Sequence, residues 1–128
     1  MTLDSMTPDG EPSADAVATL SEIDDSVAIR VWGGDWCPDC RDRLPAFAAA
    51  LAAAGIDDQR VHVYPVEKRD GEKVGPRVER DEIVSIPTVV VESGADPTDR
   101  DGSGTERARY VEDEGEPIAT WLADRLAE

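Results

Sequence analysis

The stretch SVAIRVWGGDWCPDC, residues 26–40, decides the fold. β-Branched side chains at positions 27, 29 and 31 predict a strand over 26–32, and Gly33-Gly34 predicts the turn that ends it. From residue 37 to residue 54 the apolar side chains follow helical spacing, and Gly55 predicts the end of that helix. A strand, a cysteine-bearing turn and a helix therefore form the unit around which the rest of the chain is placed.

Segments on both sides of this unit alternate between helix and strand. Ser13 predicts the cap of a short helix that ends near Asp24. Pro45 predicts a kink in the long helix, and Pro65 favours a sheet edge or a strand end because proline has no N–H to donate. The other expected segments are strands at 60–66, 86–92 and 107–111, a loop at 67–76, a short helical segment at about 77–83, a solvated loop at 93–106, and a final helix that opens at Glu116-Pro117.

This order of segments predicts an α/β fold with a small central mixed sheet of about four strands, flanked by helices on both faces. The first two strands enclose a long helix and should be parallel, whereas the last two are close enough along the chain to be antiparallel. A length of 128 residues suits one domain, which we place at 13–128 after a flexible tail at 1–12.

Acidic residues dominate the composition, with 29 Asp and Glu against 13 Lys and Arg and a formal charge of −16. This charge argues against partners held through phosphates, so we expect no nucleic acid and no anionic membrane as partner. Lys68 and Lys73 are the only lysines, and such a lysine-poor, Asp-rich composition is typical of proteins from salt-loving organisms. The first dozen residues lack the basic start and apolar run of a signal peptide, so we expect a cytoplasmic protein. Separately, we expect the protein to be a monomer.

The candidate chemistry lies in Cys37-Pro38-Asp39-Cys40, which contains both cysteines of the chain. With Pro38 as the first helical residue, Cys37 becomes the N-cap, where unpaired backbone N–H groups and the helix dipole stabilise a thiolate. Cys40 follows one turn later and can reach Cys37. This spacing favours an exposed nucleophilic thiol of lowered pKa with a resolving thiol beside it.

Three different roles for the cysteine pair are less favoured. A structural disulfide across so short a loop would remove only about 2 kcal/mol of denatured-state entropy. A zinc site needs four ligands, and the chain adds a single histidine, His62, which alternates with valines on a strand; we therefore expect no metal. A phosphate cradle between Cys37 and Arg43 would lack an N–H at Pro38 and would place Asp39 against the anion.

At this point the sequence resembles the thioredoxin family. The resemblance is carried by Trp36-Cys-Pro-Asp-Cys40 after a strand, by Pro45 eight residues past the first cysteine, and by Ile86-Pro87-Thr88 before an apolar strand. It covers about residues 25 to 127 and implies a thioredoxin-like fold. It also implies that Pro87 follows a cis peptide bond, packs against the cysteines and, with Ile86 and Thr88, shapes a groove for an extended substrate.

The sequence departs from the family at two positions. Many thioredoxins hold a buried aspartate six residues before the first cysteine, and here that position is Val31; an aromatic residue two positions later is replaced by Gly33. Asp39, between the two cysteines, is the candidate replacement for the missing base. Trp36 is expected to be an exposed contact surface, so Trp36, Pro38 and Asp39 would support the site, whereas Trp32 and Trp121 are expected in the core.

The sequence therefore predicts a thiol–disulfide oxidoreductase that reduces disulfides of proteins or small molecules and contributes to cell redox homeostasis. Cys37 would attack and Cys40 would resolve. No bound cofactor is implied, and electrons would come from a reductase or a low-molecular-weight thiol. Two alternatives stay open: a glutaredoxin-like thiol transferase, and a redox-sensing module that binds peptides without turnover.

Overall fold

A computed structural model describes residues 6–24, 26–75, 77–94, 96–100, 102, 104–111 and 115–126. Helices and strands follow closely the order expected from the sequence. They are helices α1 (Ala14–Ser21), α2 (Pro38–Ala53) and α3 (Ile118–Leu126), the short 3₁₀ helix η2 (Asp58–Arg60), and strands β1 (Ala28–Gly33), β2 (Val61–Pro65), β3 (Glu67–Arg69), β4 (Glu72–Val74), β5 (Thr88–Ser93) and β6 (Thr105–Val111).

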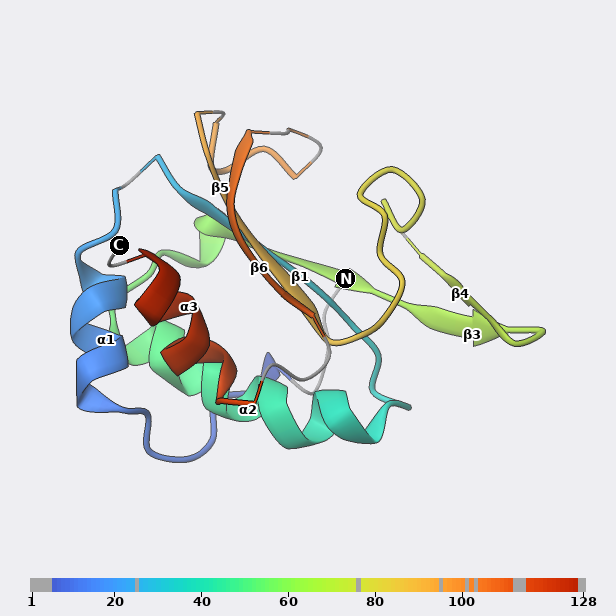
Figure 1. The fold of residues 1–128 in the computed structure, drawn as a ribbon, viewed down its shortest axis with the longest axis horizontal. Coiled ribbons are helices and arrows are strands. Elements are labelled where there is room, and N and C mark those ends of the chain that lie inside the picture. The colour runs from blue at the N-terminus through green and yellow to red at the C-terminus, as the bar shows by residue number, and fades with distance from the viewer. Residues whose placement is uncertain are drawn as a thin grey trace.

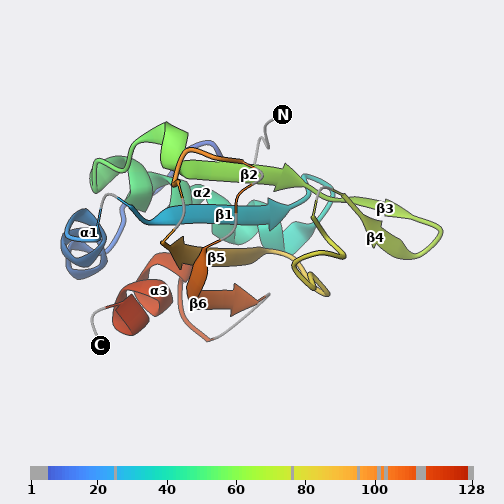
Figure 2. The ribbon, with the colours of Figure 1, turned by 90° about the horizontal axis from the view of Figure 1, so that it is seen from above.

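Four strands form one mixed sheet in the order β2-β1-β5-β6 (Figure 2). Strands β1 and β2 are parallel, whereas β5 is antiparallel to both β1 and β6. The structure thus confirms the α/β class, the four-stranded mixed sheet and both expected strand pairings. Pro65 is the last residue of the edge strand β2. At the end of an edge strand, the N–H that proline lacks is not needed to continue the hydrogen bonding of the sheet.

Helix ends also follow the sequence signals. Ser13 caps α1 by accepting a hydrogen bond from the N–H of Ala16 at 3.4 Å. Helix α2 contains Pro45 and is followed by Gly55 with φ of 75°. The carbonyl oxygen of Pro45 accepts a hydrogen bond from the N–H of Asp9 at 3.1 Å, so the segment before α1 lies against α2.

The three helices α1, α2 and α3 lie together on one face of the sheet (Figure 1). The expectation of helices on both faces is therefore wrong. The segment at 77–83, predicted as a helix, consists of turns, and Arg77 and Glu82 adopt positive φ values of 63° and 57°. Left-handed residues at both ends of so short a segment stop a helix from propagating, which removes the element that could have covered the second face.

The loop expected at 67–76 contains a hairpin, which is a second correction. Strands β3 and β4 pair antiparallel around the two-residue turn Asp70-Gly71, whose φ values are 51° and 83°. A two-residue turn with both φ values positive suits the right-handed twist of a hairpin, and Asp-Gly is among its preferred sequences. Asp70-Gly71 is therefore the sequence feature from which this hairpin could have been predicted.

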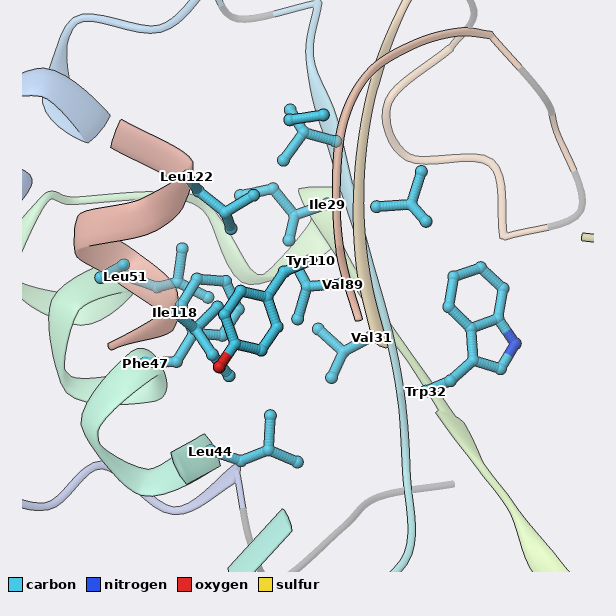
Figure 3. Packing of buried hydrophobic residues seen from close by; sticks show 14 of the residues in the cluster. Ile29, Val31, Trp32, Leu44, Phe47, Leu51, Val89, Tyr110, Ile118 and Leu122 are labelled. Carbon is cyan, nitrogen blue, oxygen red and sulfur yellow. The ribbon is translucent and has the colours of Figure 1, made fainter. Parts of the chain in front are cut away.

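The core fills the space between the sheet and the helices (Figure 3). Ile29 and Val31 of β1 point toward the helices, where Phe47 and Leu122 pack against them. Trp32 points to the opposite face and stacks on Tyr64, with ring centroids 4.8 Å apart. Trp32 is fully buried as expected, whereas Trp121 is only half-buried and meets Tyr110 edge-on.

Polar groups and the β5–β6 loop cover the second face of the sheet. Arg30 forms a buried ion pair with Glu92 and donates to the carbonyl oxygen of Arg100 at 3.2 Å. Arg77 donates to the same carbonyl at 2.9 Å, and the Tyr64 hydroxyl donates to it at 2.7 Å. Half of the described residues of this loop are exposed and the other half are partly buried, and these hydrogen bonds hold its backbone against the sheet. Among the described helices, none is both long and apolar enough to cross a bilayer.

Candidate active site

Cys37 occupies the N-cap of α2, as the sequence predicts. Its backbone is extended, Pro38 takes the first helical position, and the Cys37 carbonyl accepts the first helical hydrogen bond from Arg41 at 3.1 Å. The Cys37 side chain makes no capping hydrogen bond. Its sulfur therefore lies at the positive end of the helix dipole without being used to hold the helix.

The two cysteine side chains approach to 3.3 Å, and both are free thiols. Cys40 is 0% exposed and belongs to the core, whereas Cys37 is 7% exposed. The pair is thus asymmetric. Both thiols are nevertheless buried, so the exposed Cys37 expected from the sequence is not observed.

Burial raises the pKa of the Cys40 thiol to about 12. The neighbouring Cys37 thiol and the charge of Asp39 act in the same direction, while a backbone hydrogen bond from Gly34 opposes them. Desolvation dominates because a buried thiolate loses its hydration. Cys40 consequently carries its proton at neutral pH and must lose it before it can act as a nucleophile.

The Ile86-Pro87 peptide bond is cis, as the resemblance to thioredoxins implies. The Cys37 thiol donates a long hydrogen bond to the carbonyl oxygen of Ile86 at 3.9 Å, so this segment lies beside the reactive sulfur. Ile86, Pro87 and Thr88 are all buried. The Thr88 hydroxyl is used internally, since it donates to the carbonyl oxygen of Ser85 at 2.6 Å.

Trp36, directly before Cys37, is 43% exposed, in agreement with its expected place on the surface. Its indole Nε1 donates to the carbonyl oxygen of Val66 at 2.8 Å. The indole lies over Gly34, where an added Cβ would stand 2.5 Å from Nε1 and 2.8 Å from the Val66 oxygen. Gly34 and Val66 thus fix the position of the indole, a role that was not predicted from the sequence, where Gly33-Gly34 indicated only a turn.

Asp39 lies in the first turn of α2, where it is partly exposed and 3.8 Å from the guanidinium of Arg43. Its charge reaches Cys40 and raises the pKa of that thiol. The position of the family's buried acid is filled by Val31, which is 0% exposed in the core. Asp39 is therefore a carboxylate whose charge acts on Cys40.

His62 is a buried strand residue, and its Nε2 lies 2.8 Å from the carbonyl oxygen of Pro97. Burial is the main cause that lowers the pKa of His62, and the charges of Arg30, Arg100 and Arg77 lower it further. The hydrogen bond to the Pro97 carbonyl opposes these effects by raising the pKa. Within the described ranges, no group of three or more His, Cys, Asp or Glu side chains is placed to hold a metal ion.

No protein-family model matches this chain, and no curated protein is significantly similar to it.

Proposed function

We propose that this protein is a thioredoxin-like dithiol oxidoreductase that reduces disulfides in proteins or small molecules. The observation that carries the proposal is the asymmetric thiol pair: Cys37 at a helix N-cap and Cys40 fully buried, 3.3 Å apart. The sheet order β2-β1-β5-β6 and the cis Ile86-Pro87 peptide beside Cys37 support the thioredoxin-like class.

The first step of the reaction is attack by the Cys37 thiolate on one sulfur of the substrate disulfide. A bond forms between Cys37 Sγ and that sulfur, the substrate S–S bond breaks, and the other substrate sulfur leaves as a thiolate that takes up a proton. The N–H groups at the start of α2 stabilise the attacking thiolate. Trp36 and the Ile86-Pro87 segment border Cys37 and would position the substrate chain.

In the second step Cys40 loses its proton and attacks Cys37 Sγ. The Cys37–Cys40 disulfide forms and the second substrate sulfur leaves and is protonated, so two electrons and two protons pass to the substrate. With a pKa of about 12, Cys40 stays protonated until this step, so the step requires a base. Asp39 is the carboxylate that we propose for that role.

The cycle closes when an external reductant converts the Cys37–Cys40 disulfide back to the dithiol. We propose a reductase or a low-molecular-weight thiol as donor, and the cytoplasm as the compartment, because there the glutathione and thioredoxin systems maintain dithiols.

The test is reduction of insulin by dithiothreitol with substoichiometric amounts of the protein. We expect repeated turnover with the wild type and its loss in Cys37→Ser. Cys40→Ser should also lose turnover, and full turnover by this variant would indicate thiol transfer of the glutaredoxin kind. An effect that only scales with the amount of protein added would reject the proposal in favour of a binding module.

A further inference from the structure

The β3–β4 hairpin extends away from the sheet and the helices (Figures 1 and 2). All residues from 67 to 74 are exposed, so the hairpin adds nothing to the core. Two strands of three residues are also short for independent stability.

The hairpin carries the only two lysines of the chain, and they lie directly opposite each other. Lys68 and Lys73 form a cross-strand pair, in which like charges on one face are destabilising. The acidic side chains point to the other face, where Glu67 binds Arg69 at 2.6 Å and Glu72 lies opposite Arg69. As far as the structure describes the chain, neither lysine has an ion-pair partner. One face of the hairpin, defined by these lysines and here named the lysine face, is thus locally basic.

The two ends of the hairpin lie close to each other, beside the residue that holds the Trp36 indole. Val66, the residue before β3, accepts the hydrogen bond of the Trp36 indole at 2.8 Å. Gly75, the residue after β4, packs so closely on the Pro65 carbonyl that an added Cβ would stand 2.7 Å from that oxygen. Since Trp36 directly precedes Cys37 in the chain, the base of the hairpin contacts the segment that leads into the dithiol.

We propose that the lysine face binds an acidic segment of a partner protein whose disulfide is presented to Cys37. This inference rests on the proposed function and names its substrate class. A chain of charge −16 repels acidic proteins over most of its surface, so an acidic partner needs a local cationic contact to dock. Carboxylates between the two ammonium groups would also relieve their mutual repulsion. The lysines therefore make acidic disulfide proteins preferred substrates.

The experiment compares two synthetic peptides of equal length with the same internal disulfide, flanked by glutamates in one and by glutamines in the other. Reduction is followed for the wild type, for Lys68→Gln/Lys73→Gln, and for the matched control Arg107→Gln/Arg125→Gln, which removes the same charge from exposed sites on β6 and α3. The assay uses the lowest salt at which far-UV circular dichroism shows each variant folded, and is repeated at about 1 M salt, where charges are screened beyond about 3 Å.

We expect the wild type to show a higher kcat/KM for the glutamate peptide at low salt, and the lysine variant to lose about fivefold on that peptide alone. The control should retain the preference, and high salt should reduce it. Equal loss on both peptides, or an unchanged preference in the lysine variant, would overturn the inference.

A neutral small disulfide, hydroxyethyl disulfide, separates this inference from the proposed function. If the wild type reduces neither this disulfide nor insulin, the proposed function fails. Binding is then measured by fluorescence anisotropy with a labelled glutamate peptide whose cysteines are replaced by serine. Tighter binding to the wild type than to the lysine variant would still support the lysine face, and equal binding would reject it.

Discussion

The thiol of Cys37 faces the carbonyl oxygen of Ile86 at 3.9 Å, across 49 positions of the chain. This contact joins the N-terminus of α2 to the segment that precedes β5, so the two motifs that stand out in the sequence meet in space. A peptide that lies extended beside Ile86 would run past the reactive sulfur. The contact thus places the proposed nucleophile beside the segment where we propose that the substrate backbone lies.

Raising the pH should destabilise the protein through Cys40. The folded-state pKa of this thiol is about 12, against 9.0 without burial, so the unfolded chain releases the proton first as the pH rises. The stabilisation of the folded state that comes from the raised pKa of Cys40 is fully present below about pH 9. It is lost progressively as the pH rises toward 12. Guanidinium denaturation at pH 8 and pH 10.5 measures the loss, and Cys40→Val should show a smaller one. An equal loss in both proteins would show that other groups cause it.

Gly34→Ala should displace the Trp36 indole. The new Cβ would stand 2.5 Å from Nε1 and 2.8 Å from the Val66 oxygen, so we expect loss of that hydrogen bond and a destabilisation of about 1–3 kcal/mol. Chemical denaturation measures the free energy of unfolding, and acrylamide quenching reports exposure of the indole. Trp36→Phe is the control, because phenylalanine keeps an aromatic side chain but lacks the indole N–H that donates to Val66. Unchanged stability in Gly34→Ala would show that the indole can move at no cost.

Asp39→Asn should lower the pKa of Cys40, because the Asp39 carboxylate raises it through its charge. If Asp39 also accepts the Cys40 proton, release of substrate from the Cys37 mixed disulfide should slow by about tenfold or more. Stopped-flow exchange with a disulfide peptide separates attack from release. Asp42→Asn is the matched control, since Asp42 lies 3.7 Å from the same Arg43 guanidinium but is mostly exposed. Equal release rates in the wild type and both variants would show that Asp39 does not accept the Cys40 proton.

Glu92→Gln should destabilise the fold by about 3 kcal/mol without affecting the dithiol. The substitution leaves the Arg30 guanidinium charged and buried on the second face of the sheet, and removing one partner of a buried pair is costly. Glu106→Gln, which breaks an exposed pair with Arg109, should cost less than about 1 kcal/mol. Urea denaturation of both variants gives the comparison. A similar loss in the free energy of unfolding for both variants would contradict the claim that breaking the buried Arg30–Glu92 pair costs more than breaking an exposed one.

Local signals made much of the fold and the site predictable. The residues around Trp36-Cys37-Pro38 carry their own turn and helix start, and β1, β5 and α3 show clear apolar patterns. The hairpin was missed because its only signal is the dipeptide Asp70-Gly71 between strands of three residues. No local pattern of the sequence indicated that Arg77 and Glu82 would adopt positive φ.

Long-range contacts could not be predicted in the same way. Arg30 and Glu92 look like surface residues of alternating strands until the β5–β6 loop covers them. The support that Gly34 and Val66 give to Trp36 depends on where β2 ends relative to β1, which is a property of the sheet register.

The most direct test of the central claim is to trap the mixed disulfide. Cys40→Ser and Cys37→Ser are each incubated with a disulfide peptide at neutral pH, and the adducts are located by mass spectrometry of proteolytic fragments without reduction. We predict a stable adduct on Cys37 in Cys40→Ser and little or none on Cys40 in Cys37→Ser, because Cys40 is buried and protonated. Absence of an adduct on Cys37, or equal labelling of Cys40 in the folded Cys37→Ser variant, would contradict the proposed roles of the two thiols.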